Sequence, residues 1–219
     1  MNLTNPADEY CCDFFLSIGS NCRPAINLKL NGLREFSAPL DYMMNYSLDT
    51  VIHLFRDGFK DFFSEYEIDS ETPKGAVGMR RVNDTKNHIV SIHHFPEDVP
   101  MDESYPLFIE KMSARAERLE RYLQNASCIV LVSDRTDPKE DMCEFLRAFS
   151  GIYPHLNIRL INMRHDKNAP YDSYRQEPVF SDGSLSYIEY IFNDTDHGLD
   201  GNVFVWSKIL SNYVISPRV

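Results

Sequence analysis

Residues 14–30, FFLSIGSNCRPAINLKL, constrain the possible folds of this chain more than any other segment. An apolar run of the kind that forms a buried strand is followed at once by a Gly-Ser-Asn turn. Pro24 is tolerated in the first turn of a helix, where its missing N–H would have no partner, and Gly32 follows where a helix stop belongs. The segment therefore predicts a strand, a tight turn and a helix, with Cys22 at the start of the helix.

The rest of the chain predicts helices and strands in mixed order. Runs rich in apolar or β-branched residues predict strands at residues 88–95, 128–134, 157–163 and 184–193. Amphipathic or apolar segments predict helices at residues 47–59, 105–124, 138–149 and 203–214. Residues 60–85 and the polar, Tyr-rich segment after residue 163 are predicted as loops, the first with one irregular helix. No internal repeat or long polar linker divides the chain, so we expect a single α+β domain over residues 1–219.

Composition narrows the range of partners. With 219 residues, 43% of them hydrophobic, the chain can bury one sizeable core. Its formal net charge of −11 argues against nucleic acid, because binding phosphate requires clustered Lys and Arg, and equally against an anionic membrane surface. No apolar run reaches the ~20 residues of a membrane-spanning helix, and the opening MNLTNPADEYCC lacks the features of a signal peptide. We expect a cytoplasmic protein that binds neither nucleic acid nor membrane, and its oligomeric state stays open.

The remaining cysteines and the acidic motifs predict no cofactor. Five cysteines, an odd number at irregular spacing, argue against a disulfide framework. We interpret four of them as small apolar residues: Cys11, Cys12, Cys128 and Cys143. Asp194, Asp196 and Asp200 resemble a calcium loop, but Gly198 stands where a ligand belongs and no glutamate closes the loop, so a solvated turn is favoured. Without an HExxH motif or paired CxxC motifs, we expect no metal.

Cys22 stands apart because of its position. Unpaired backbone N–H groups at the start of a helix stabilise an anion, and Arg23 adds positive potential. Both effects predict a lowered thiol pKa and a nucleophilic thiolate. The same N–H groups, helped by Ser17 or Asn21, could hold an oxyanion during acyl transfer. The alternative is a capping turn around a buried, unreactive thiol.

A thiolate nucleophile needs a base, and the predicted strand SIHHF offers two histidines. Side chains alternate along a strand, so His93 should share a face with Ser91 and Phe95 while His94 faces the other way. Only one of the two histidines can then face Cys22. The alternative is that these histidines are structural side chains.

The segment FLSIGSNCRPAINLKLNGLREFSAPLDY resembles the opening signature of a bacterial family of papain-like cysteine peptidases of unknown function. Its members read SLGxxCxxAxxL, then GLRxxSxPFDW, and later a strand that ends in HDF. The matching residues are Ser17, Gly19, Cys22, Ala25, Leu28, Gly32, Leu33, Arg34, Ser37, Pro39 and Asp41. Three positions depart from the pattern, because Leu40 and Tyr42 replace Phe and Trp, and His94 replaces the aspartate of HDF.

The resemblance implies a papain-like core, in which a helix carrying the nucleophile packs on a mostly antiparallel sheet carrying the histidine. It implies Cys22 as nucleophile and His93 as general base, then as acid to the leaving group. Asp134, at the end of the next predicted strand, is the first choice to orient the imidazole, and Asp41 is the second. The alternatives are that Asp134 is a turn aspartate and that Asp41 fixes its loop through backbone groups or Arg34.

The function expected from these residues is a metal-independent cysteine hydrolase or acyl-transfer enzyme. The bond attacked would be a peptide, isopeptide, amide or thioester bond, in a peptide or protein-conjugate substrate. His94 could serve as the base instead, although His93 is favoured. The rival reading is a non-catalytic interaction or regulatory module, favoured by the missing acid beside His93. A Cys22 sulfur within about 4 Å of an imidazole nitrogen would favour the enzyme.

Overall fold

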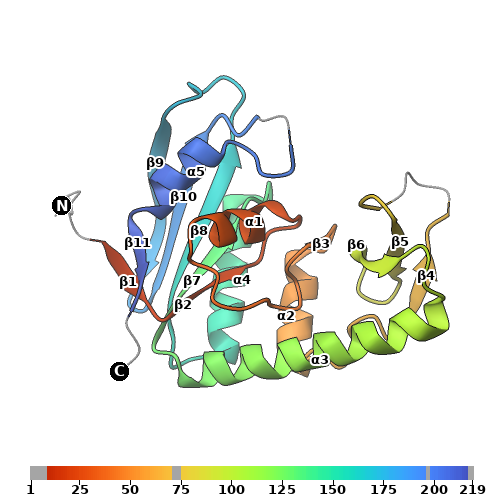
Figure 1. Cartoon of the computed structure of the whole chain (residues 1–219). Helices are drawn as coiled ribbons and strands as arrows, with labels where there is room; N and C mark the ends of the chain where they lie inside the picture. Colours follow the sequence, from red (N-terminus) through yellow and green to blue (C-terminus); the bar gives the residue numbers. More distant parts are fainter. Residues whose placement is uncertain (1–8, 71–74, 196–197, 217–219) are drawn as a thin grey trace.

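The computed structural model describes residues 9–70, 75–195 and 198–216, which form a mixed α+β structure as predicted. Neighbouring strands of the main sheet pair in parallel, except that β9 closes one edge in the antiparallel direction (Figure 1). The order across this five-stranded sheet is β2 (Phe14–Ser17), β7 (Cys128–Ser133), β8 (Asn157–His165), β10 (Leu185–Phe192) and β9 (Tyr174–Asp182).

A second sheet has four strands and is antiparallel throughout. Its order is β3 (Met43–Met44), β6 (Ile89–Pro96), β5 (Met79–Asp84) and β4 (Tyr66–Ile68). Two further short strands, β1 (Tyr10–Cys12) and β11 (Tyr213–Ile215), pair with each other in parallel.

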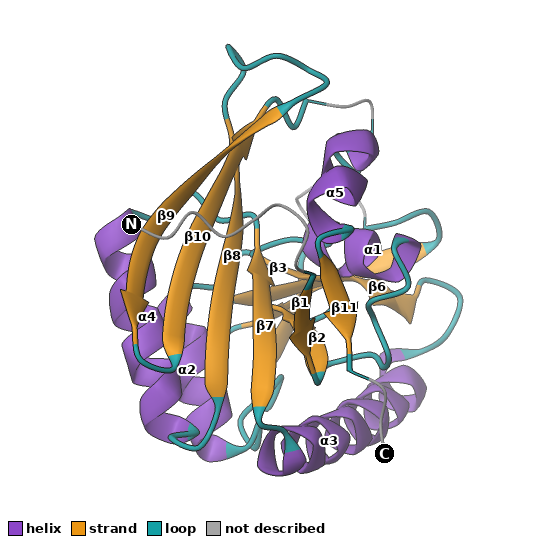
Figure 2. Ribbon diagram, turned by 90° about the vertical axis from the view of Figure 1, so that its left-hand side faces the viewer, coloured by secondary structure: helices purple, strands orange, loops and turns teal. Residues whose placement is uncertain are grey.

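Helices cover both faces of the main sheet (Figure 2). One face packs against α2 (Leu48–Asp57) and α4 (Lys139–Ile152), and the other against α1 (Arg23–Leu30) and α5 (Val203–Leu210). The long helix α3 (Met101–Asn125) runs beneath both sheets in Figure 1 and joins β6 to β7. Among the described residues, no helix combines the length and apolar character needed to cross a membrane.

Strand β7 shows why the main sheet is readily predicted. Ile129 and Leu131 point into the core shared with α2 and α4, whereas Val130 and Val132 point into the core around Trp206 of α5. These four side chains of β7 are all fully buried. A strand that is buried on both faces needs a continuous apolar sequence, which is the signal that this segment carries.

The expected packing of the Cys22 helix on a mostly antiparallel sheet is wrong. Helix α1 packs on β2 of the mostly parallel main sheet and on α5, and it is the second sheet that is antiparallel. The physical reason lies in the connection between the parallel neighbours β2 and β7. It passes through α1, α2, the second sheet and α3, and so provides the long crossover that parallel pairing requires.

The segments predicted as loops contain three strands that the pattern does not reveal. All three residues of β4 are exposed, and all nine residues of β9 are exposed or half-buried, so neither carries a clear apolar alternation. The third is β5, which ends the segment predicted as an irregular loop. The prediction of a small buried thiol holds for Cys12 but is wrong for Cys11, which is exposed in β1.

Candidate active site

The turn that carries Cys22 connects β2 to α1, and Cys22 is the N-cap residue of that helix. The turn is tightly packed at Gly19, where a Cβ atom would lie 2.5 Å from Pro24 Cγ and 2.6 Å from Asp134 Oδ1. Real Cβ atoms do not come so close to other heavy atoms, so the turn requires glycine. The glycine therefore allows the turn that carries Cys22 to pack closely against Asp134 at the end of β7.

Asn21 holds this turn from both sides. Its side-chain Oδ1 accepts a hydrogen bond from the Arg23 N–H at 2.8 Å, and its Nδ2 donates to Asp134 Oδ2 at 2.6 Å. Asp134 directly follows β7, the neighbour of β2, so the ends of two parallel strands bring the pair together. On the other side of the turn, the Asn45 N–H donates to the Ser20 carbonyl at 3.0 Å.

A β-bulge carries the two histidines. In the pairing of β5 with β6, Arg80 is opposite Phe95 and Val82 is opposite Ser91, so residues 92–94 are opposed by a single residue. Bulges break the alternation of side chains and redirect them. The predicted alternation is therefore wrong here, because Ser91 Oγ and His94 Nδ1, expected on opposite faces, lie 3.0 Å apart.

The structure brings Cys22 and His93 together, with Cys22 Sγ 3.5 Å from His93 Nε2. His94 turns away toward α3, where its ring centroid lies 5.5 Å from that of Phe108. Cys22 is almost fully buried, at 3% exposure, whereas His93 is half-buried. Cys22 lies in the turn after β2 of the main sheet, and His93 lies in the bulge of β6 in the second sheet. Only the tertiary fold makes them neighbours.

Tyr42 is a site residue that the sequence reasoning missed. Its ring meets the His93 ring edge-to-face, with centroids 5.9 Å apart, and its backbone adopts a positive φ of 65°. Arg34 in turn contacts Tyr42. Its guanidinium carbon is 5.1 Å from the Tyr42 ring centroid, and its Nη1 donates a hydrogen bond to Tyr42 Oη at 3.3 Å. The only sequence signal was that Tyr42 occupies the aromatic position of the PFDW-like motif.

The two predicted orienting carboxylates contact other groups. Asp41 Oδ2 accepts from Arg34 Nε at 2.8 Å and from the Ala38 N–H at 3.0 Å, so it fixes its own loop. Asp134 holds Asn21, as described above, and its Oδ1 is buried without a hydrogen-bond partner. Within the described residues, neither carboxylate, nor any other group, hydrogen-bonds to Nδ1 of His93.

Burial controls the charge of the pair. It raises the pKa of the Cys22 thiol to about 11, and the carboxylates of Asp134 and Asp41 add to the effect. Burial also lowers the pKa of His93 and raises that of Asp134 to about 6. The resting pair is therefore a neutral thiol beside a neutral imidazole. The predicted lowering of the thiol pKa is wrong, because α1 is short, its Arg23 N–H is taken by Asn21, and removal from water outweighs its dipole.

The two predicted oxyanion helpers differ in position. Asn21 adjoins Cys22, and one N–H of its amide remains after the bond to Asp134. Ser17 is buried in β2, and none of the hydrogen bonds described for this part of the chain links it to Cys22 or His93. The backbone N–H of Cys22 donates to no described acceptor.

Two other polar clusters bear on metal binding. Asp194, predicted in a solvated turn, is buried: it accepts hydrogen bonds from Arg23 Nη1 at 2.8 Å and from Trp206 Nε1 at 3.1 Å, and so ties α1 to α5. Asp196 of the same motif lies outside the described residues. Ligand atoms of His53, Asp57 and Asp61 lie within 4.8 Å of one another, but the Lys86 ammonium already pairs with Asp61 Oδ2 at 2.7 Å.

Comparison with protein families matches residues 13–168, most of the chain and all the residues of this site, to the family described as "Putative papain-like cysteine peptidase (DUF1796)". The chain belongs to this family. One relative, an uncharacterized protein of Acanthamoeba polyphaga mimivirus, is 25% identical over 141 residues. The alignment covers 58% of this chain and 63% of the viral protein, so the chain spans less than two thirds of that relative. No solved structure matches the chain.

Proposed function

We propose that this protein is a cysteine hydrolase or acyl-transfer enzyme in which Cys22 is the nucleophile and His93 is the general base. The observation that carries the proposal is the distance of 3.5 Å between Cys22 Sγ and His93 Nε2. This distance fits a thiol that hands its proton to an imidazole during attack. The name of the family supports the same class of reaction.

The reaction begins from the neutral pair. As the Cys22 sulfur bonds to the carbonyl carbon of the substrate, the thiol proton passes to His93 Nε2. The imidazolium then donates that proton to the leaving amine or thiolate as the tetrahedral intermediate collapses to an acyl-enzyme. In the second half, His93 takes a proton from water, the resulting hydroxyl group joins the acyl carbon, and the proton returns to the Cys22 sulfur.

The turn supplies donors for the developing oxyanion. These are the backbone N–H of Cys22 itself and the second N–H of the side chain of Asn21, the residue before it. Asp134 fixes the Asn21 amide, and the Arg23 N–H determines which end of that amide is oxygen. In this proposal, Asp134 acts on the nucleophile turn and has no direct role in orienting the base.

Tyr42 and Arg34 orient His93 in place of a carboxylate. The edge-to-face ring contact restrains the plane of the imidazole, and Arg34 fixes the phenol. Because no described acid contacts Nδ1, the imidazolium formed during attack gains less stabilisation than in a triad with aspartate. We therefore expect modest turnover on unactivated amides and faster acylation by esters or thioesters, with a peptide or protein conjugate as the class of substrate.

The second candidate is a binding module that keeps the pair without turnover. The raised pKa of the Cys22 thiol favours it, as does the finding that no acid among the described residues hydrogen-bonds to His93. The two candidates differ in a single measurable event, namely acyl transfer to Cys22.

The experiment is acylation by p-nitrophenyl acetate, followed by peptide mapping of the acetyl group on all five cysteines. If the protein is an enzyme, we expect a burst of p-nitrophenolate equal to the protein concentration, with the acetyl group on Cys22. The exposed Cys11 is the internal control for simple chemical reactivity. Acetylation that is slow and favours Cys11, and that persists unchanged in Cys22→Ala, would leave only the binding module.

A further inference from the structure

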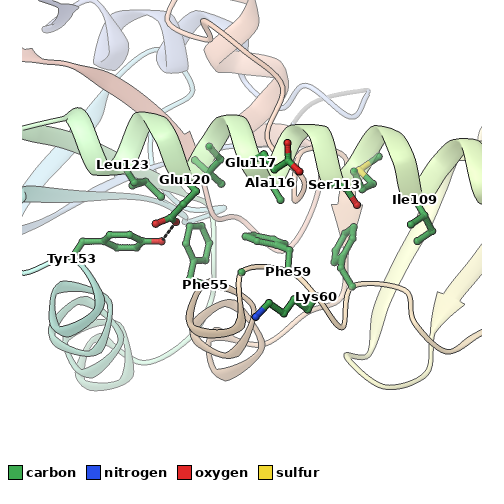
Figure 3. Close-up of a pocket in the computed structure, with 14 residues that line it drawn as sticks. Phe55, Phe59, Lys60, Ile109, Ser113, Ala116, Glu117, Glu120, Leu123 and Tyr153 are labelled. Carbon is green, nitrogen blue, oxygen red and sulfur yellow. Dashed lines mark hydrogen bonds between the residues drawn. The ribbon is translucent and has the colours of Figure 1, made fainter.

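Helix α3 has two unlike polar flanks on either side of its buried stripe. On one flank, Glu117 and Glu120 line a cavity of about 340 Å³ between α3, α2 and Tyr153, and Glu120 accepts a hydrogen bond from the Tyr153 hydroxyl (Figure 3). The other flank is basic. Lys111, Arg115 and Arg118 follow at helical spacing and so share one face.

Arg115 is the unusual member of the basic flank. Its Nη1 is shielded from solvent and has no hydrogen-bond partner, and its guanidinium forms no ion pair with any described residue. A cation partly removed from water without a partner destabilises the fold, so such a group calls for an explanation. Asp41 is the acid whose charge acts most strongly on Arg115, but its Oδ2 is already held by Arg34 and the Ala38 N–H.

Helix α3 packs against β6, the strand that carries the two histidines. Phe108 of α3 packs against the rings of His94 and Phe95, at 5.5 Å and 4.6 Å between centroids, and thus seats α3 against the end of β6 that bears the bulge. The electrostatic neighbours of Arg115 include Tyr42, which is the residue in contact with His93. The charge of Arg115 therefore acts on the residue whose ring contacts the imidazole.

We propose that Arg115, flanked by Lys111 and Arg118, forms a subsite for an anionic group, a carboxylate or a phosphate, on the substrate of the Cys22–His93 site. The proposal rests on the hydrolase function proposed above and names its substrate class. Lys111 and Arg118 are exposed and add long-range attraction, whereas the half-buried Arg115 supplies the direct contact. The strongly acidic remainder of the surface repels anions, so a local basic subsite would give orientation as well as affinity.

The test compares matched acyl donors. The p-nitrophenyl ester of N-acetylglutamate carries a carboxylate that the ester of N-acetylglutamine lacks, and the phosphoserine and serine esters form the corresponding phosphate pair. We expect wild-type protein to prefer the anionic member of at least one pair, and the pair that responds identifies the anion. Arg115→Gln should reduce that preference roughly tenfold while leaving acylation by the neutral ester unchanged.

Three controls make the result decisive. Arg121→Gln removes an equal charge from an exposed position of α3 and should keep the preference. Arg115→Lys keeps a cation and should restore part of it. Calorimetric titration with glutarate and inorganic phosphate measures anion binding without turnover, and binding should be weakened most by Arg115→Gln, less by Arg115→Lys and not by Arg121→Gln.

The outcomes separate the two proposals. If the neutral esters acylate Cys22 but no preference depends on Arg115, the subsite is wrong and the hydrolase stands. If no ester acylates Cys22, the hydrolase is wrong, and Arg115-dependent anion binding would then mark a binding site without acyl transfer, which also overturns the subsite as a substrate site.

Discussion

The turn that carries Cys22 and the bulge that carries His93 are built in opposite ways. The turn is fixed by direct bonds: Asn21 bridges Arg23 and Asp134, the Tyr46 hydroxyl donates to the Gly19 carbonyl, and no Cβ fits at Gly19. The bulge holds His93 by its backbone path and one ring contact, and its Nδ1 bonds to no described group. The nucleophile is therefore rigidly placed, while the base is restrained mainly by packing.

This difference predicts where mutations act. Changes in the turn should affect folding stability as well as reactivity, because close packing and buried hydrogen bonds are lost together. Changes around the bulge should affect reactivity with little loss of stability. The predictions below test that contrast, from the largest expected effect to the smallest.

The largest effect is expected at the base itself. His93→Asn should slow acylation of Cys22 by p-nitrophenyl acetate about 10²- to 10⁴-fold, because proton transfer from the neutral thiol loses its acceptor. His94→Asn is the matched control: His94 contacts Ser91 and Phe108 rather than Cys22, so the rate should fall less than about threefold. Equal losses in the two variants would contradict the assignment of His93 as the base.

The next effect belongs to the turn. Gly19→Ala should lower the free energy of unfolding by about 2–3 kcal/mol, because the new methyl group meets Pro24 and Asp134 at clashing distances. Chemical denaturation measures it. In contrast, Gly151→Ala in α4 meets nothing within 4 Å and should stabilise the protein by about 0.5–1 kcal/mol. A Gly19→Ala protein as stable as wild type would mean that the turn is not the rigid element.

The same contrast explains what the sequence could predict. The turn is local, so its strand, glycine and helix start could be recognised from consecutive residues. The bulge depends on pairing with β5, which carries no apolar pattern at this point, so alternation predicted the wrong neighbours for His94. Tyr42 meets His93 only through tertiary packing. The thiol pKa could not be inferred either, since a local dipole argument omits the burial of Cys22 and the charge of Asp134.

A moderate effect is expected from the ring that restrains His93. Tyr42→Leu removes the edge-to-face contact and should reduce the acylation rate about threefold to tenfold, with little change in the KM for the ester. Tyr42→Phe keeps the ring and loses only the hydrogen bond from Arg34, so its rate should stay within about twofold of wild type. If the phenylalanine variant is as slow as the leucine variant, the hydroxyl rather than the ring positions the imidazole.

The smallest effect is expected from replacing Asp134, and the direction of the change in reactivity distinguishes two roles for this residue. Its charge raises the pKa of the Cys22 thiol, so Asp134→Asn should lower that pKa and favour the thiolate. Because burial is the larger cause, the shift should be below about one pH unit. Alkylation of Cys22 by iodoacetamide, followed as a function of pH, should then begin at lower pH in the variant and proceed a few times faster at a given pH below the thiol pKa.

Asparagine still accepts from Asn21, which keeps the turn in place. If Asp134 instead oriented His93, the substitution would slow acylation tenfold or more and leave the pH dependence of alkylation where it is in the wild type.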